Sequence, residues 1–323
     1  MCPADAGVCS DWTDAAFRGA PPCFDRPPEV TGQARGSRVY PQGVDPQGVN
    51  PQGVDPETPI SVIRRFGITT LERDLTEFTV VAHMPIGGMF NPFTGLPTVA
   101  SLAVLVDDVA GRVNYDRCGR GQWTVSSELV VEMSPGAVAS ILSAPDEPVL
   151  ASARPLGPAG ATLLSVCTLT HCGTVIGGGT VRTVPVDGGP DEPRVPGDDP
   201  LVRTPTTALS ELLAVGPPSI EDATQRLQQR PDPMVNNLIG IVHGGVSSAG
   251  LELVAAAAIN HEQSEPFRTA SIRVNFLRPF IAGAQSVYEG TALRIGRTSA
   301  IGDATAIGDD GKTAIIARVT GYR

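Results

Sequence analysis

Apolar and polar positions follow a regular order along residues 206–323. A long apolar run predicts a helix over about 245–260, because it exceeds the length of an ordinary strand. Segments of alternating pattern follow it and predict strands near 269–278, 285–295, 299–308 and 313–321. The turn residues Asp309-Asp310-Gly311-Lys312 predict a hairpin between the last two strands. Upstream, Ser219 in an N-cap position predicts a short helix extending to about residue 229.

The same order of elements occurs earlier in the chain. A helix is predicted near 98–112, and strands near 123–133, 149–157, 161–171 and 174–185. Shifting the later region back by 145 residues places Glu252 on Asp107 and Thr269 on Thr124, so each carboxylate precedes its threonine by seventeen residues. This spacing predicts an internal repeat of two similar domains. Three glycines at 177–179 indicate a bulged or closely packed strand, because no helix or Lys-Ser pair follows them.

Two stretches of the chain differ in composition from these regions. Residues 1–58 are rich in Pro and Gly and contain three tandem copies of a Pro-Gln-Gly-Val repeat, which predicts a disordered segment. Residues 185–205 combine prolines, glycines and acidic residues, which is typical of a solvated linker. The sequence therefore predicts domains at 59–184 and 206–323.

Charge and composition exclude several classes of function. The net charge of −10 argues against a nucleic-acid partner, since binding phosphates requires clustered Lys and Arg. The six cysteines have no zinc-binding spacing, and the four histidines form no metal-ligating pattern. No apolar run reaches the roughly 18 residues of a membrane span, and the N-terminus does not have the pattern of a signal peptide. A cytoplasmic protein with reduced thiols is expected.

A polar, glycine-rich turn leads into the predicted helix at 245–260. It contains Asn237, Gly240, His243, Gly244 and Gly245. The adjacent glycines allow close approach of the backbone, and amide N–H groups at a helix start have no helical partner. Together with the helix dipole they form a site suited to a developing oxyanion. Nine residues after the histidine, Glu252 is a single carboxylate in an apolar segment, where a charge is unfavourable.

This segment resembles the hotdog-fold acyl-CoA thioesterases of the PaaI type. Their pattern is Asn-x-x-Gly-x-x-His-Gly-Gly, followed by Asp or Glu nine residues after the His, and the resemblance covers roughly residues 206–323. It implies an α+β fold in which an antiparallel sheet wraps round a long central helix. With the internal repeat, the chain is expected to be a tandem double hotdog, in which two hotdogs of one chain pack together in place of a homodimer.

The resemblance also implies that each active site is shared between two hotdogs. One hotdog supplies the His-Gly-Gly helix start, and the other supplies the carboxylate and a nearby hydroxyl. The first region has Thr98-Val99-Ala100 where the second has His243-Gly244-Gly245. One working site per chain is therefore expected, in which Asp107 and Thr124 face Asn237, His243 and Gly244. The pocket containing Glu252 and Thr269 would be degenerate or structural.

Roles follow from the resemblance as expectations. The Gly244 N–H would bind the thioester oxyanion, and Asn237 would orient the attacking water or the carbonyl. Asp107 would act as general base or as nucleophile, held by Thr124, with Asp108 as the alternative carboxylate. Residues expected to bind substrate, including the phosphates of coenzyme A, are Gly245, Arg278, Arg294 and Arg297.

The expected reaction is hydrolysis of an acyl-CoA or acyl-carrier-protein thioester without a metal or other cofactor. Two alternatives stay open at this point. A non-catalytic acyl-CoA binding protein would have the same architecture with an inactive site. A hotdog hydratase or dehydratase would carry an Asp two residues before the asparagine, and Val235 stands at that position here. The expected partner is the thioester substrate, and a homodimer would give a four-hotdog assembly.

Overall fold

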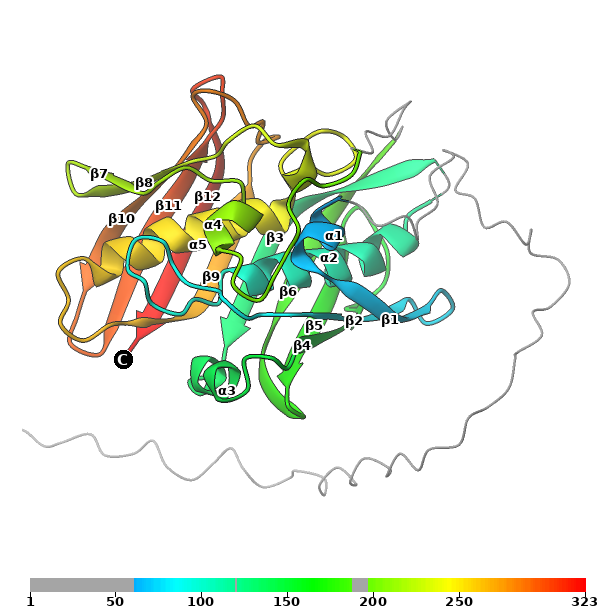
Figure 1. Cartoon of the computed structure of the whole chain (residues 1–323). Coiled ribbons are helices and arrows are strands. Elements are labelled where there is room, and N and C mark those ends of the chain that lie inside the picture. The colour runs from blue at the N-terminus through cyan, green and yellow to red at the C-terminus, as the bar shows by residue number, and fades with distance from the viewer. Residues whose placement is uncertain (1–60, 120, 188–196) are drawn as a thin grey trace, which may run out of the picture. The chain divides into compact units, whose positions relative to one another are not determined.

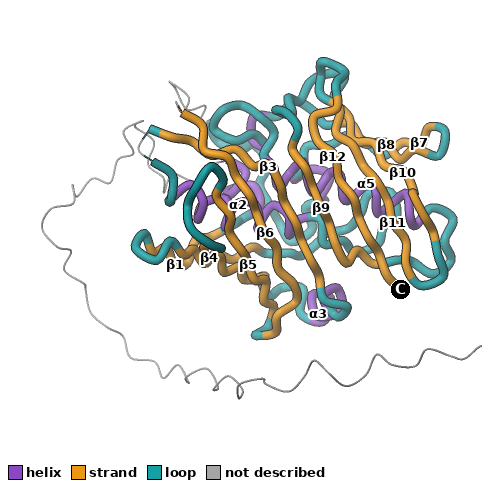
Figure 2. The backbone as a smooth tube through the Cα atoms, turned by 180° about the vertical axis from the view of Figure 1, so that it is seen from behind, coloured by secondary structure: helices purple, strands orange, loops and turns teal. Residues whose placement is uncertain are grey.

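The computed structural model describes residues 61–119, 121–187 and 197–323 (Figure 1), and all of them fall in one compact unit. The predicted disorder of residues 1–58 lies outside this range. Within it, the strands form one 12-stranded antiparallel sheet in the order β1-β2-β4-β5-β6-β3-β9-β12-β11-β10-β8-β7. The long helices α2 and α5 lie on the same face of the sheet, as Figures 1 and 2 show from opposite sides.

The first hotdog extends from α1 to β6. Its elements are α1 (Ser61–Phe66), β1 (Thr69–Asp74), β2 (Thr79–Met84), α2 (Ser101–Asp116), β3 (Gln122–Met133), α3 (Ala137–Ser143), β4 (Val149–Pro155), β5 (Leu163–His171) and β6 (Thr174–Asp187). The predicted helix and four strands of this half are all present. β6 extends three residues into the predicted linker, whose residues 188–196 lie outside the described range. Later linker residues contact the first hotdog, since Asp199 accepts two hydrogen bonds from the buried Arg65 guanidinium at 2.7 Å.

The second hotdog repeats this order. Its elements are α4 (Leu209–Leu212), β7 (Ser219–Glu221), β8 (Thr224–Gln228), η1 (Pro233–Val235), α5 (Gly244–Asn260), β9 (Arg268–Phe276), β10 (Val287–Ile295), β11 (Ser299–Ile307) and β12 (Thr313–Tyr322). The hairpin predicted at 309–312 joins β11 to β12, with Gly311 at a positive φ of 74°.

The short helix predicted from Ser219 is wrong, because this segment is the β7–β8 hairpin. Asp222 and Ala223 at its tip both have positive φ, 46° and 65°, as a two-residue hairpin turn requires. β8 then pairs with β10 at the end of the sheet, and Leu227 is buried. Buried and half-buried positions alternate in β8, which is a strand pattern, and pairing with β10 outweighs the local helix signal.

The two hotdogs join through β3 and β9, at the centre of the sheet. Leu129 pairs with Val274, which is its counterpart under the offset of 145 residues. Where a residue pairs with its own equivalent, a pseudo-twofold axis passes between the strands. The offset found in the sequence therefore coincides with the symmetry of the sheet.

The ladder between β3 and β9 is not symmetric about this axis. It continues for three pairs on one side, to Glu132↔Ser271, but for a single pair on the other side, to Glu128↔Asn275. β3 carries a bulge between Ser126 and Glu128 at the point where the ladder stops. Bulges bend a strand and end its pairing. Beyond this point β3 and β9 diverge, and space is left between them.

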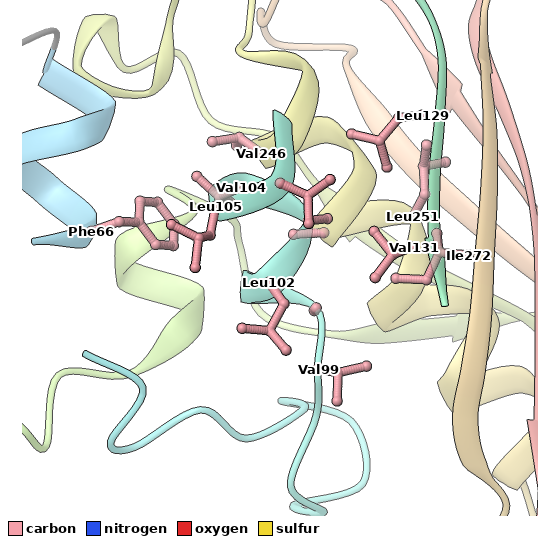
Figure 3. Packing of buried hydrophobic residues seen from close by; sticks show 14 of the residues in the cluster. Phe66, Val99, Leu102, Val104, Leu105, Leu129, Val131, Val246, Leu251 and Ile272 are labelled. Atoms are coloured by element: carbon pink, nitrogen blue, oxygen red, sulfur yellow. The ribbon is translucent and has the colours of Figure 1, made fainter. Parts of the chain in front are cut away.

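The core lies between the sheet and the two helices. Leu102 and Leu105 from α2, Leu251 from α5, and Leu129 and Ile272 from the central strands belong to one buried cluster (Figure 3). Nearly all residues of α5 are buried, so the helix is covered on every side. The glycines at 177–179 are closely packed as predicted, because a Cβ on any of them would meet a backbone carbonyl oxygen of β3 or β5. α2 and α5 contact each other within this core, and this contact positions the candidate site.

Candidate active site

The turn before α5 is held by its own polar side chains. Asn237 Oδ1 accepts hydrogen bonds at 3.1 Å from the backbone N–H groups of Ile239 and Ile241. The His243 N–H donates to the Val235 carbonyl at 2.9 Å, and His243 is the N-cap residue of α5. Because its oxygen is engaged in the turn, the Asn237 amide NH₂ is the group left to meet a ligand, and Asn237 does line the cavity described below.

Asp107 of α2 faces the start of α5 from the other hotdog. Its Oδ2 accepts the Gly245 N–H at 2.7 Å and lies 3.3 Å from His243 Nδ1. Its Oδ1 accepts a hydrogen bond from Ser126 Oγ of β3 at 3.1 Å. The Gly245 N–H is also 3.1 Å from His243 Nδ1, and the shorter distance makes the carboxylate its main acceptor. A proton on Nδ1 would then complete a His243–Asp107 hydrogen bond.

The two glycines allow this approach. A Cβ on Gly245 would lie 2.5 Å from Val104 Cα and 2.8 Å from the Ala103 carbonyl oxygen, both in α2. A Cβ on Gly244 would lie 2.8 Å from Asp107 Oδ2. Ordinary carbon contacts are about 3.5–4.0 Å, so any larger residue would push the two helices apart. Gly245 therefore contributes to helix packing and donates a hydrogen bond to Asp107, and the substrate-binding role expected for it stays a prediction.

Burial dominates the electrostatics of Asp107. The desolvation of its carboxyl group raises its pKa above the ordinary value of 3.8. His243, the Gly245 N–H and Ser126 Oγ act in the opposite direction, and neighbouring Asp108 adds a small upward contribution. A carboxylate whose pKa is moved toward neutrality is better suited to accept a proton at physiological pH.

Asp108 points to a different partner. Both of its oxygens lie 3.0 Å from the Arg112 guanidinium, one turn later in α2. Arg112 also donates to Thr70 Oγ1 of β1 at 2.6 Å. Although both aspartates border the same cavity, the one that contacts the start of α5 is Asp107.

A cavity of about 570 Å³ opens beside the Asp107 carboxylate. It lies where β3 and β9 diverge, between Trp123 to Ser127 on one side and Phe276 to Phe280 on the other. Its volume is in the range of small-molecule sites. Thr124, Asn237, His243, Gly244 and Arg278 all line it. Arg294 and Arg297 are absent from its lining, and they lie at the β10–β11 turn.

The equivalent position in the second hotdog is nearly closed. A pocket of about 30 Å³ contains Glu252, whose carboxylate accepts hydrogen bonds from Thr98 Oγ1 at 2.8 Å and Thr269 Oγ1 at 2.5 Å. Thr98 takes the place of His243 under the offset of 145 residues, and Ala100 takes the place of Gly245. The Ala100 N–H donates to Thr98 Oγ1 at 3.1 Å. Burial raises the pKa of Glu252, and the two threonines oppose this shift.

The hydroxyl that contacts Asp107 is Ser126, where Thr124 was expected. Both residues lie on one face of β3, because side chains two apart point the same way. Glu252 reaches the first of the two equivalent positions, Thr269, whereas the shorter Asp107 meets the second. The alternation of side chains along β3 places Thr124 and Ser126 on the same face, so the sequence gives no reason to prefer one of them as the partner of Asp107. Thr124 instead lines the cavity.

No group of three or more His, Cys, Asp or Glu side chains within 61–119, 121–187 and 197–323 could hold a metal ion. None of the helices in these ranges is long and apolar enough to cross a membrane.

Part of the second hotdog is similar to a known protein family. Residues 239–315 match the family model of the thioesterase superfamily. No curated protein sequence matches the chain.

Solved structures extend the similarity to both hotdogs. The tesB protein of Mycobacterium avium subsp. paratuberculosis has a TM-score of 0.53 at 9% identity, over 81% of this chain and 97% of that one. The acyl-CoA thioesterase II TesB2 of Mycobacterium marinum has a TM-score of 0.51 at 13% identity, over 81% of this chain and 96% of that one. At such identities the likeness establishes the fold, and the predicted α+β double hotdog is confirmed. The PaaI type stays a prediction. The superfamily match supports thioester hydrolysis in general terms.

Proposed function

We propose that this protein hydrolyses acyl thioesters at the site formed by Asp107 and the start of α5. One observation carries the proposal. The buried Asp107 carboxylate of the first hotdog lies 2.7 Å from the Gly245 N–H at the helix start of the second hotdog, beside a largely apolar cavity. A carboxylate and a helix N-terminus that face one cavity are the two components that water attack on a carbonyl requires.

The Gly244 N–H is the proposed oxyanion donor. Gly244 is the first residue of α5, where helical hydrogen bonding has not yet begun, so its N–H has no acceptor within the helix. The positive end of the helix dipole adds to its effect on a negatively charged oxygen. Removal of one such donor lowers rates by about 100–1,000-fold in other acyl-transfer enzymes.

Asp107 serves as the general base in this proposal. It takes a proton from water as the water oxygen attacks the thioester carbon, and the oxyanion forms at the Gly244 N–H. Collapse of the tetrahedral species breaks the C–S bond, and the thiolate takes a proton, so the products are a carboxylic acid and a thiol. His243 Nδ1 and Ser126 Oγ orient the carboxylate. Direct attack by Asp107, giving a mixed anhydride that water then cleaves, is the alternative chemistry at the same group.

The proposed substrate is an acyl-CoA or an acyl-carrier-protein thioester. The similar structure from Mycobacterium marinum is described as an acyl-CoA thioesterase, which favours the first. Arg278 is exposed at the cavity and supplies a cation for the phosphates of the thiol carrier. Arg294 and Arg297 have no role in substrate binding in this proposal, because they lie at the β10–β11 turn and do not line the cavity.

The experiment is thiol release from short, long and aromatic acyl-CoAs by wild type, Asp107→Asn and Glu252→Gln. Asp107→Asn keeps the size of the side chain and is expected to reduce turnover at least 100-fold. Glu252→Gln, the matched change at the equivalent position, is expected to retain turnover. Loss of turnover only with Glu252→Gln would place the reaction in the other pocket. Tight binding of acyl-CoAs by the wild type without any turnover would mean a binding protein.

A further inference from the structure

Gly111 is unusual among the glycines of this structure. It lies in the interior of α2, where glycine is less favourable than any residue except proline. It is not one of the glycines with positive φ. A Cβ built on it would meet no atom within 4 Å, whereas a Cβ on Gly250 of α5 would lie 2.6 Å from the Tyr288 ring. Neither backbone conformation nor helix packing therefore explains a glycine at this position.

The missing side chain faces the cavity. Asp107, Gly111 and Tyr115 are spaced by four residues, so they follow one face of α2, and all three line the cavity. From Asp107 to Tyr115 the helix rises about 12 Å. Trp123 meets Tyr115 edge to face, with ring centroids 5.2 Å apart. A lane thus runs from the carboxylate to this aromatic pair, and Gly111 is its midpoint.

The lane offers little net charge to a ligand. Arg112 holds both oxygens of Asp108, and Arg73 holds both oxygens of Asp116. Ile63 and Val184 contribute further apolar surface to the cavity. By contrast, Arg278 is exposed and belongs to the second hotdog. A phosphate-bearing carrier fits the Arg278 side, and an uncharged chain fits the lane along α2.

We propose that Gly111 determines acyl chain length, and that the lane between Asp107 and the Tyr115–Trp123 pair holds an unbranched, medium-length acyl chain. This rests on the proposed thioesterase function. A lane of about 12 Å matches an extended chain of roughly eight to ten carbons, since each staggered C–C bond of about 1.5 Å advances the chain by somewhat less than its length. A side chain at position 111 would fill the middle of the lane and leave room only for short acyl groups.

The test compares wild type with Gly111→Ala and Gly111→Leu on butyryl-, octanoyl-, decanoyl- and dodecanoyl-CoA. Each buried methylene is worth about fourfold in kcat/KM. The decanoyl-to-butyryl ratio of kcat/KM is expected to fall slightly in Gly111→Ala and at least tenfold in Gly111→Leu. Melting temperatures should equal or exceed that of wild type, because both residues favour a helix more than glycine does. Gly136→Leu is the matched control, since Gly136 is exposed, has open space at its Cβ and does not line the cavity.

A second readout does not depend on turnover. Trp123 lines the lane, and Trp12→Phe removes the other tryptophan of the chain, so that decanoate binding can be followed by fluorescence in that background. Decanoate is expected to change the Trp123 emission, and Gly111→Leu to weaken its binding at least tenfold.

The outcomes separate this inference from the proposed function. Turnover by wild type with an unchanged chain-length ratio in Gly111→Leu would overturn the role of Gly111. An equal rise in KM for all four substrates would overturn it too, because it would place the carrier in the lane. Decanoate binding sensitive to position 111, without turnover of any thioester by wild type, would overturn the thioesterase function while keeping the lane as an acyl site.

Discussion

Gly245→Ala tests whether the close crossing of α2 and α5 builds the site. The added methyl group would lie 2.5 Å from Val104 Cα and 2.8 Å from the Ala103 carbonyl oxygen, in backbone that cannot rotate away. Reaching an ordinary contact of about 3.5–4.0 Å requires the helices to separate by about 1 Å. Overpacking of this kind destabilises a protein by about 1–3 kcal/mol.

The same movement acts on the reaction. The same separation of about 1 Å would lengthen the Gly245 N–H to Asp107 contact from 2.7 Å to beyond the range of a hydrogen bond. Misplacement of a reacting group by about 1 Å can reduce a rate by about 100-fold. Gly245→Ala is therefore expected to lower kcat by between 10- and 100-fold. Its melting temperature should fall by about 2–4 °C for each kcal/mol lost.

The control comes from the other hotdog. Ala100 occupies the position equivalent to Gly245, where the chain already accommodates a methyl group, and its N–H bonds Thr98 in place of a carboxylate. Ala100→Gly is expected to leave turnover within about twofold of wild type and to cost about 1 kcal/mol of stability for one buried methyl group. Thiol release and thermal unfolding, measured on both variants, test whether the close contact at Gly245 is required for activity and stability. A Gly245→Ala protein with the activity and melting temperature of wild type would refute the reasoning.

Three further predictions concern buried charges. Burial raises the pKa of Glu252, so its favourable contribution is present at low pH and is lost as pH rises through the folded-state pKa. The melting temperature of Glu252→Gln relative to wild type should therefore increase from about pH 4 to about pH 8, and a constant difference would contradict this. Ser126→Ala removes a hydrogen bond that lowers the pKa of Asp107, so the acidic limb of the pH–rate profile of this variant should move to higher pH. Thr124→Val is the control and should leave the acidic limb at the pH of wild type. Arg65→Met leaves Asp199 and Asp232 without their buried partner. The free energy of unfolding measured in urea should fall by about 3–5 kcal/mol. A loss below about 1 kcal/mol would mean that water compensates both carboxylates.

Much of the fold could be predicted because the repeat is visible in the sequence. The offset of 145 residues matches the pairing of Leu129 with Val274, and both long helices are apolar runs with one or two acidic interruptions. The β7–β8 hairpin was missed because Asp222-Ala223 is not a typical turn sequence, and pairing with β10 decides its structure. Strands β1 and β2 and helix α3 were also not predicted.

The site was partly accessible from sequence. The spacing of Asp107 and of the His243 turn led to a pairing across the two hotdogs, and the structure brings these residues within hydrogen-bond distance. The choice of Ser126 over Thr124 depends on side-chain length and on a bulge, neither of which alternation of polarity reveals. The large difference between the two pockets arises from the uneven β3–β9 ladder, a long-range property of strand pairing. Gly111 gives no signal without the cavity that it faces.

The joining of both hotdogs in one polypeptide has a consequence for how the protein responds to dilution. In an assembly of separate subunits, the two parts of a shared site separate when the protein concentration falls below the dissociation constant of the subunit interface. Here Asp107 and the His243 turn are held at an effective concentration set by the chain that connects them. Specific activity should therefore stay constant down to nanomolar protein, and the predicted pairing of two chains into a four-hotdog assembly would not be needed to form the site.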